Sequence, residues 1–395
     1  MRILIAPDKF KGSLSADAVA AAIEEGWRRT RPLDCIERVP ISDGGDGFGF
    51  LLAGLLGAEE RVTKVIDAAG RPIQASWWFH EQSRTAVIEA AQANGLAQLP
   101  SGVFHPFVLD TFGVGMLLEE CAKARPLRCL IGIGGSATND GGFGMARAVG
   151  WKFLDQRNEP ISSWTELVGE RAGQFKGGDE SAAGFERRMS RCEPPATSIS
   201  LGEILVAVDV RNPLLGEEGC TRCYGPQKGL KPGDFERAEA ALGTLQAGMS
   251  SREKAGIERL PGAGAAGGLG YGLAVFLGAR LVPGFDLYAE KAGLPKRIQE
   301  VDLVITGEGK IDRTTLMGKG AGGIAHLCAE LGKPCIALGG GTDGEPGLAA
   351  RFTRVATLVP DQTTLEEALR QPARHLADLA ASVAHSTGSS VSTPR

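Results

Sequence analysis

Apolar runs and amphipathic segments alternate at both ends of the chain. Residues 2–6 form a short apolar run typical of a strand, and a helix follows in which Val19, Ile23 and Trp27 recur every four residues after a capping Ser15. Such alternation predicts an α/β fold with a parallel sheet covered by helices. The other elements predicted at the two ends are an apolar helix over 48–56 and strands over 37–41, 301–305, 335–338 and 356–358.

The middle of the chain is less regular. Residues 77–79 and 85–89 predict two paired strands, and 127–133 is a nearly continuous apolar run of the kind buried on both faces of a sheet. A strand over 204–208 resumes the pattern. Between the apolar run at 127–133 and this strand, residues 155–200 are polar and glycine-containing, so we expect a long loop with little core.

The two regular blocks lie at opposite ends, which favours one domain built from both ends with another inserted between them. We predict a domain over 1–65 plus 286–385 and an inserted α/β domain over 66–285. Residues 386–395 are polar, and we expect them to be a disordered tail.

Charge and apolar content exclude several classes of protein. The 43 basic and 47 acidic residues leave a net charge of −4 without a basic block, so nucleic acid is not an expected partner. No stretch approaches the ~20 apolar residues of a membrane span, and the apolar run near residue 1 is shorter than a signal sequence requires, so we expect no signal sequence. We therefore expect a cytoplasmic protein without a membrane partner.

The eight cysteines are scattered and do not resemble a disulfide framework. Cys220 and Cys223 form one CxxC pair, which in principle could be half of a zinc site or a redox pair. The pair has no second CxxC or nearby histidine, and its surroundings do not suggest a helix start after a strand. We interpret the spacing as coincidental.

Glycine is unusually frequent, at 56 of 395 residues, and it is concentrated in loops. The clearest loop follows the strand at 127–133 and precedes a helix over 145–149. Its glycines let backbone amides approach an anion, and the helix N-terminus adds partial positive charge. We expect it to bind phosphate or substrate through Gly134, Gly135, Ser136, Thr138 and Asn139, with Asp140 holding Mg²⁺.

The same loop also fits the dinucleotide fingerprint, as Gly132-x-Gly134-x-x-Ala137 with Asp155 about 20 residues later. Its position in mid-chain and its polar sequence speak against that interpretation. A second match, which includes Gly264, does not follow an apolar strand, although it could be another anion site at the start of a helix.

Acidic residues stand just after predicted strands, where the ligand crevice of a parallel sheet lies. Carboxylates gathered there suit Mg²⁺ binding and activation of a hydroxyl for phosphoryl transfer. The residues are Asp8, Asp43, Asp209, Glu308 and Asp312, and lysines stand in or near the glycine loops at 9, 11, 228, 310 and 319. The Walker, GxSxG, HExxH and HRD motifs are absent, and the five histidines lie outside the glycine loops.

Together these motifs resemble the bacterial glycerate kinases of the type-1 family, over nearly the whole chain and in the family's order. Two residues depart from the usual pattern, because members often have Ser at the position of Lys9 and Glu at that of Asp46. The matching segments are IAPDKFKGSLS at 5–15, SDGGDG at 42–47, residues 131–142, DVRNP at 209–213, GPQKG at 225–229, PGAGAAGG at 261–268, ITGEGKID at 305–312 and Gly318-Lys319.

The resemblance implies transfer of the γ-phosphoryl group of ATP to D-glycerate with Mg²⁺. It further implies a flavodoxin-like domain formed by both chain ends and an inserted domain resembling the restriction-endonuclease fold, with the reaction in a cleft between them. The usual product is 2-phosphoglycerate, and some members form 3-phosphoglycerate. The oligomeric state is not decided by the sequence, and a homodimer is one possible assembly.

We expect the loops at 8–13, 43–47, 134–142 and 306–312 to form the site, with the identity of the general base left open. Two other functions are weighed against the kinase: a nicotinamide-dependent oxidoreductase of a small 2-hydroxy acid and a non-catalytic phosphometabolite-binding protein. The predicted catalytic residues are Lys11, Asp43, Asp209 and Asp312; the substrate or phosphate ligands are Asp8, Ser13, Gly134, Gly135, Ser136, Asn139, Lys228, Gly264 and Lys319; the metal ligands are Asp140 and Glu308.

Overall fold

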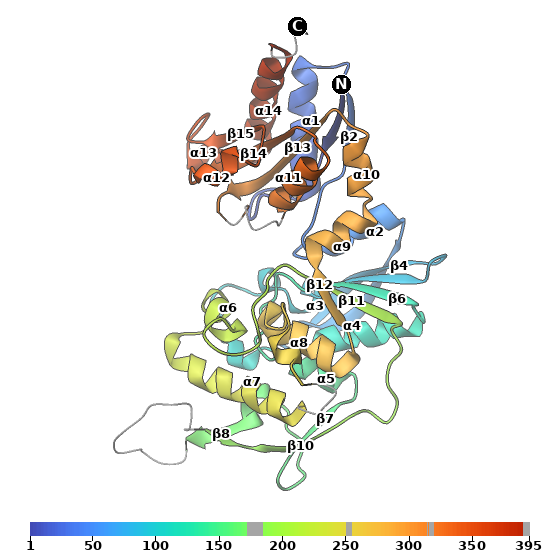
Figure 1. The fold of residues 1–395 in the computed structure, drawn as a ribbon. Coiled ribbons are helices and arrows are strands. Elements are labelled where there is room, and N and C mark those ends of the chain that lie inside the picture. Colours follow the sequence, from blue (N-terminus) through green and yellow to red (C-terminus); the bar gives the residue numbers. More distant parts are fainter. Residues whose placement is uncertain (172–184, 250–254, 314, 316–319, 390–395) are drawn as a thin grey trace. The chain divides into compact units, whose positions relative to one another are not determined.

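Two compact units divide the chain in the computed structural model, which describes residues 1–171, 185–249, 255–313, 315 and 320–389 (Figure 1). Met1–Asp43 and Phe285–Arg395 form one unit, here called the terminal unit, and Gly44–Gly284 form the other, here called the central unit. One unit is therefore built from both ends of the chain, and its first segment stops at Asp43 rather than at residue 65.

The terminal unit contains a five-stranded parallel sheet in the order β15-β14-β13-β1-β2. Ile3 pairs with Leu303 on one side and with Ile36 on the other, so β1 lies in the interior of the sheet. The predicted parallel sheet is confirmed. Its strands are β1 (Arg2–Ile5), β2 (Cys35–Arg38), β13 (Leu303–Ile311), β14 (Cys335–Thr342) and β15 (Arg354–Val359).

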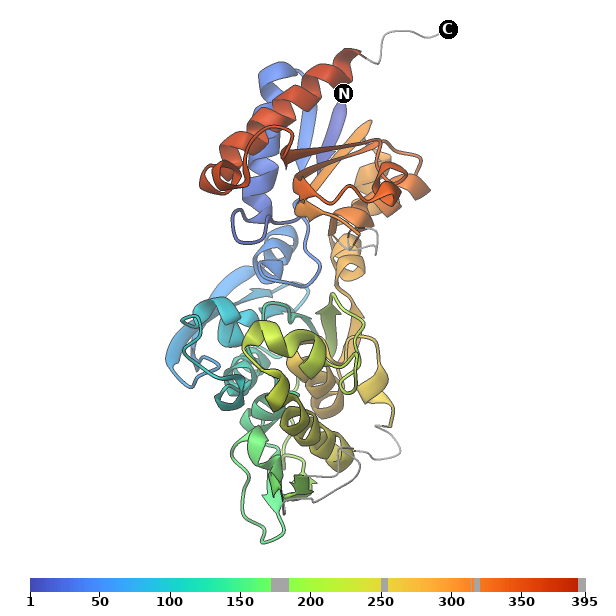
Figure 2. The same cartoon turned by 90° about the vertical axis from the view of Figure 1, so that its left-hand side faces the viewer.

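Helices α1 (Ala16–Thr30) and α14 (Pro372–Ser389) pack side by side on this sheet (Figures 1 and 2). Ser15 caps α1 by accepting a hydrogen bond from the amide of Ala18, as the sequence predicts. A Cβ on Gly26 would lie 1.9 Å from the carbonyl oxygen of Ala377, so glycine allows this close approach. The other helices of the unit are α9 (Gly284–Lys291), α10 (Leu294–Gln299), α11 (Gly320–Glu330), α12 (Pro346–Ala349) and α13 (Leu365–Arg370).

Helix α14 enters the segment for which the sequence predicts disorder. Its last described residue is Ser389, so residues 386–389 are helical. The rest of that segment, 390–395, lies outside the described residues. The prediction of a disordered tail from residue 386 is therefore wrong for its first four residues.

The central unit is built on a six-stranded mixed sheet in the order β12-β11-β6-β5-β4-β3. β3, β4 and β5 pair antiparallel, whereas β5, β6, β11 and β12 pair parallel. The predicted pairing of 77–79 with 85–89 is confirmed, and β6 is buried as expected. The strands are β3 (Glu59–Ile66), β4 (Pro72–His80), β5 (Thr85–Glu89), β6 (Arg128–Gly132), β11 (Glu203–Val208) and β12 (Arg280–Pro283).

Helices of the central unit enclose one large apolar core against this sheet. α2 has the bounds predicted for it. Short 3₁₀ segments lie in the connections over Leu96–Gln98, Pro106–Val108, Trp164–Leu167, Pro232–Asp234 and Ile257–Arg259. The helices are α2 (Phe48–Leu56), α3 (Ala91–Asn94), α4 (Phe112–Lys123), α5 (Phe143–Ala148), α6 (Cys220–Lys228), α7 (Phe235–Met249) and α8 (Ala265–Leu277).

The expectation that residues 155–200 form a loop with little core is wrong. Trp164, Leu167 and Met189 in this segment are buried in the core of the central unit. Polar residues alternate with these apolar anchors, which hides the pattern in the sequence. Two antiparallel pairs occur here, β7 (Lys152–Asp155) with β10 (Met189–Glu193) and β8 (Val168–Arg171) with β9 (Phe185–Arg187).

None of the helices within the described residues combines the length and the apolar character that crossing a membrane requires.

Candidate active site

The terminal unit gathers acidic side chains at the carboxyl ends of its central strands. Asp8 follows β1, and its amide donates a 2.8 Å hydrogen bond to the carbonyl of Gly307 on β13. Glu308 comes next on β13, which continues to Ile311 instead of ending at residue 305 as predicted. Glu308 therefore stands on a rigid strand, beside the turn that carries Asp8.

Glu308 has a strongly perturbed carboxyl group. Burial raises its pKa to about 7, and the nearby charges of Asp8, Asp312 and Asp43 act in the same direction. The hydroxyl of Thr315 donates a 2.6 Å hydrogen bond to Oε1 of Glu308 and opposes part of that rise. A carboxyl group with a pKa near neutral is suited to accept a proton at physiological pH.

Thr315 also fixes the neighbouring acid. Its hydroxyl accepts a 3.1 Å hydrogen bond from the amide of Asp312 while it donates to Glu308. Asp312 in turn forms an ion pair with Lys310 at 3.3 Å. One buried threonine thus links two of the predicted acidic residues, and the sequence analysis missed it.

The donor chemistry of this cluster suits Mg²⁺ only in part. In the described part of the chain, no three acidic, histidine or cysteine side chains are grouped so that they could hold a metal ion. Mg²⁺ in kinases is commonly held by one or two carboxylates together with water and the phosphates of the nucleotide. The carboxylates of the terminal unit fit that second arrangement.

The basic and polar residues predicted after β1 lie in the turn that follows it. Lys11 is exposed, and a Cβ on Gly309 of β13 would lie 3.4 Å from its amide nitrogen. Ser13 is half-buried and donates to the carbonyl of Phe10 at 3.1 Å. Loop 8–13 and β13 are therefore neighbours, as expected, whereas Lys319 lies outside the described residues.

In the central unit, the glycine loop at 134–142 packs against protein backbone. The amide of Gly134 donates to the carbonyl of Gly44 at 3.1 Å, and a Cβ on Gly134 would lie 2.5 Å from Cα of Gly45. On the other side, a Cβ on Gly267 would lie 2.0 Å from the carbonyl oxygen of Thr138. The sequence assigns these glycines to an anion, but their absent side chains make room for neighbouring loops.

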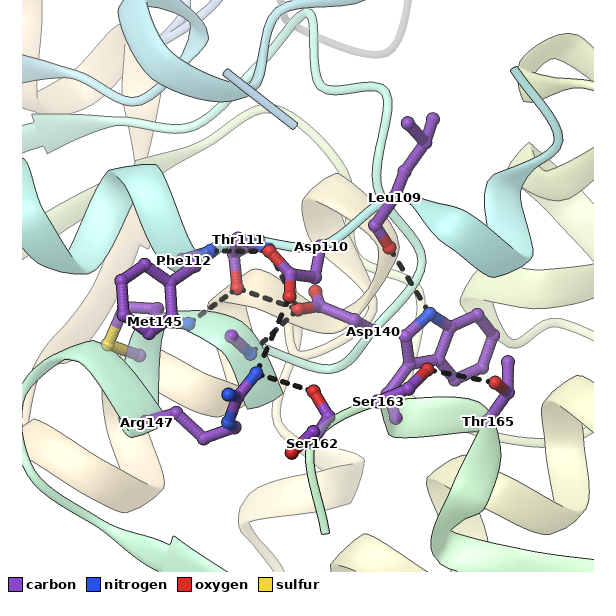
Figure 3. Close-up of polar contacts among 12 residues, drawn as sticks. Leu109, Asp110, Thr111, Phe112, Asp140, Met145, Arg147, Ser162, Ser163 and Thr165 are labelled. Atoms are coloured by element: carbon purple, nitrogen blue, oxygen red, sulfur yellow. Dashed lines mark hydrogen bonds and ion pairs between the residues drawn. The ribbon is translucent and has the colours of Figure 1, made fainter. Parts of the chain in front are cut away.

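Asp140 lies at the helix N-terminus for which the sequence predicts phosphate binding. It is fully buried, and its carboxylate accepts four hydrogen bonds, from the amides of Gly142 and Gly144 and from the amide and hydroxyl of Thr111. Figure 3 shows Asp140 beside Thr111. These bonds tie the loop to the starts of α4 and α5. Asp140 thus caps the starts of two helices, and metal binding by this residue stays a prediction.

Asp110 is a perturbed residue that the sequence analysis missed. Burial raises its pKa to about 6, and the charge of Asp140 beside it acts in the same direction. It accepts a 2.9 Å hydrogen bond from the amide of Phe112, and Arg147 lies 3.8 Å away (Figure 3). An Asp-Thr pair before an apolar helix is a capping signal that could have identified it.

Three polar side chains of the loop face α6 and α3. Nζ of Lys228 donates to Oγ of Ser136 at 2.9 Å and to the carbonyl of Thr138 at 2.6 Å. Asn139 donates to Thr221 at 3.0 Å, and Asn94 donates to the hydroxyl of Thr138 at 3.2 Å. Burial lowers the pKa of Lys228 to about 8. The predicted Ser136 and Lys228 thus belong to one hydrogen-bond network with Thr138 and Asn94, and Asn139 forms a separate bond to α6.

The remaining predicted residues of the central unit lie elsewhere in it. Asp209 is half-buried and follows β11. The amide of Gly264 donates to the carbonyl of Asn212 at 2.9 Å, and a Cβ there would lie 2.1 Å from the carbonyl oxygen of Pro213. Gly264 is therefore in backbone contact with the segment after Asp209. A Cβ on Gly135, which is exposed, would instead meet the side-chain carboxylate of Asp46.

Two alternatives from the sequence lose support. Asp155, the expected ribose ligand of a dinucleotide site, lies on β7, which pairs antiparallel with β10 and not with the six-stranded sheet. The loop at 132–137 is therefore not followed by the parallel strand of a βαβ unit. Cys220 begins α6 and is buried while Cys223 is exposed, so the pair does open a helix, contrary to expectation, and both thiols are free.

Comparison with known proteins agrees with the architecture. The model of the glycerate kinase family matches residues 3–387. A glycerate kinase of Halalkalibacterium halodurans is 38% identical, covering 93% of each chain, and a glycerate 2-kinase of Escherichia coli is 35% identical, covering 94% of this chain and 93% of the relative. A crystal structure assigned to a glycerate kinase 2 of Salmonella typhimurium aligns with a TM-score of 0.78 at 32% identity over 98% of both chains.

Proposed function

The chain belongs to the glycerate kinase family, and on this premise we propose that it transfers the γ-phosphoryl group of ATP to D-glycerate, giving 2-phosphoglycerate and ADP. The observation that carries the proposal is the acidic cluster of Asp8, Asp43, Glu308 and Asp312, in which Glu308 has a pKa near neutral. The name of the relative from Escherichia coli supports phosphorylation at the 2-position.

Glu308 is proposed as the acceptor of the hydroxyl proton of glycerate, in place of the metal-binding role that the sequence suggests for it. Its raised pKa supports this role, because a base is most effective when its pKa lies close to the working pH. Asp43 and Asp209 stay predicted catalytic residues. Lys11, exposed in the turn after β1, is proposed to offset charge on the transferred phosphoryl group.

Mg²⁺ is the proposed metal, with Asp8 and Asp312 as the carboxylates that would hold it. When bound with the nucleotide it neutralises phosphate charge. Lys310 beside Asp312 and Thr315 between Asp312 and Glu308 keep these side chains in position.

We also infer that the terminal unit is flavodoxin-like. Numbered along the chain within this unit, its strand order is 2-1-3-4-5, the order of flavodoxin-like sheets. For the central unit, a relation to the restriction-endonuclease fold is proposed on the family resemblance alone.

An assay of ADP formation tests the proposed function. The expected result is ADP release that requires D-glycerate and Mg²⁺ together, with ³¹P NMR showing phosphate on the 2-hydroxyl. Phosphate on the 3-hydroxyl would keep the kinase and correct the product. No glycerate-dependent ADP release, together with saturable NADH binding, would overturn the kinase in favour of the oxidoreductase.

A further inference from the structure

Ser136 and Lys228 form a buried donor pair in the central unit. The side chains are 6% and 7% exposed, and Nζ of Lys228 lies 2.9 Å from Oγ of Ser136. An ammonium group has three N–H donors and no acceptor, so Oγ of Ser136 must accept in this bond. The direction of the hydrogen bond is therefore fixed by chemistry alone.

The hydroxyl proton of Ser136 is then left to bond elsewhere. Within the part of the chain that the structure describes, Ser136 has no hydrogen bond in which its hydroxyl donates. Its backbone is held in place by a β-bridge to Gly95, and the carbonyl of Gly135 accepts from the amide of Leu96. A loop anchored by backbone bonds thus presents one hydroxyl donor for which no described residue is the acceptor.

The charge of Lys228 favours a negative acceptor. Its two hydrogen-bond partners, Ser136 and the carbonyl of Thr138, are neutral, and no carboxylate among the described residues forms an ion pair with it, although the charge of Asp140 raises its pKa and so opposes the effect of burial. Burying an unpaired charge is unfavourable, and burial accordingly lowers the pKa of this amine. An oxyanion that accepts from Ser136 would sit next to this charge and compensate for it.

We propose that Ser136 donates to an oxyanion of the substrates, and that Lys228 is a positioning residue that acts through Ser136. The inference rests on the proposed function and makes it more specific. Carboxylate and phosphate share the required chemistry, so the oxyanion is either the carboxylate of glycerate or a phosphate of ATP. The glycines of the loop serve packing, and the side chain of Ser136 provides the recognition.

A double-mutant cycle with Ser136→Ala and Lys228→Met tests the coupling. Each single variant is expected to raise KM for one substrate by about 10-fold to 100-fold, the size expected for a lost hydrogen bond to a charged group. The double variant should lose no more than the worse single variant, because Lys228 acts through Ser136. A rise confined to glycerate identifies its carboxylate, and a rise confined to ATP identifies a phosphate.

Controls separate recognition from folding. Ser190→Ala removes another hydroxyl of the central unit, one bonded to carbonyls of Leu154 and Asp155, and should leave both KM values unchanged. Urea titration shows whether Lys228→Met is folded. If it is not, Ser136→Ala alone tests the inference. Ser136→Thr keeps the hydroxyl and should have the KM of the unmodified protein. Unchanged KM in Ser136→Ala, equal rises for both substrates, or additive losses in the double variant would overturn the inference. Absence of turnover by the unmodified protein would overturn the proposed function instead.

Discussion

The hydroxyl of Thr111 donates a 2.8 Å hydrogen bond to Oδ2 of Asp140 and accepts a 2.9 Å hydrogen bond from the amide of Met145. Thr111 precedes α4 and Met145 lies in the first turn of α5, so one hydroxyl joins two helix starts to a buried carboxylate. Through Asp140, this hydroxyl anchors the end of the loop at 134–142 to both helices. The stability of the protein should therefore depend on it.

Thr111→Val should lower the free energy of unfolding by about 2 kcal/mol, because it removes a buried hydrogen bond to a charged group and leaves the amide of Met145 unpaired. Urea titration measures the loss. Thr111→Ser keeps the hydroxyl and serves as the matched control, with an expected loss well below that of Thr111→Val. Equal losses in both variants would contradict the hydroxyl as the main contribution of Thr111 to stability.

Asp110 should make the protein less stable as the pH rises from about 4 to about 6. Its pKa is about 6 in the folded state against an ordinary value of 3.8, so the folded state binds more protons in this range and loses stability as they dissociate. Asp140 favours the protonated form, and Arg147 and the amide of Phe112 favour the charged form. The expected contribution to the free energy of unfolding is about 2 kcal/mol. This is less than the full pKa difference implies, because solvent screens a side chain that is 27% exposed.

Asp110→Asn removes this contribution. The variant should be more stable than the unmodified protein above pH 6, and its unfolding midpoint in urea should vary less between pH 4 and pH 6. An identical pH profile in the two proteins would mean that Asp110 does not titrate in this range.

Thr315→Val should move the pH dependence of turnover. The hydrogen bond from Thr315 favours ionised Glu308, so its loss raises the pKa of Glu308 further above its present value of about 7. The acidic limb of the kcat profile should shift to higher pH by about 0.5 to 1 unit. The charges of Asp8, Asp43 and Asp312, which raise the pKa of Glu308, are still present in this variant. Glu308→Gln should lower kcat by about 10²-fold or more. A limb that stays in place in Thr315→Val would exclude Glu308 as the titrating base.

Lys11→Ala should lower kcat by about 10²-fold or more while leaving the urea midpoint unchanged. The side chain is exposed, so folding does not depend on it, whereas a charge next to the transferred phosphoryl group stabilises the transition state. Lys296→Ala, in α10 with an 82% exposed side chain, removes the same charge from the same unit and should retain full activity. An unchanged rate in Lys11→Ala would remove the proposed role.

Gly267→Ala should destabilise the protein by several kcal/mol. The residue has φ +68°, and its new Cβ would lie 2.0 Å from the carbonyl oxygen of Thr138, so the two loops could not stay in contact. Gly54→Ala is the control, because it lies in α2 with nothing near the added methyl group and should be neutral or stabilising by up to about 1 kcal/mol. Thermal or urea unfolding compares the two, and similar stabilities would contradict the packing role of Gly267.

Local features of the chain were predictable from the sequence. Ser15 caps α1, α2 spans Phe48–Leu56, and β5 spans Thr85–Glu89, because capping, helical periodicity and apolar runs act over a few residues. The parallel sheet of the terminal unit also followed from βα alternation. β3 was missed, since most of its residues are exposed or half-buried and it carries charges at its edge position.

Apolar runs, helical periodicity and short motifs were enough to predict the α/β architecture, the acidic residues after the strands and the resemblance to glycerate kinases. The contacts of each polar or glycine residue depend on how the chain folds back on itself. In a sequence, a glycine that makes room for an anion cannot be distinguished from one that makes room for another backbone segment. Gly134 and Gly267 make room for backbone. Likewise, Thr111 bonds Asp140 across 29 residues, and Glu308 has a near-neutral pKa because of burial and of the charges of Asp8 and Asp43, which no local pattern encodes.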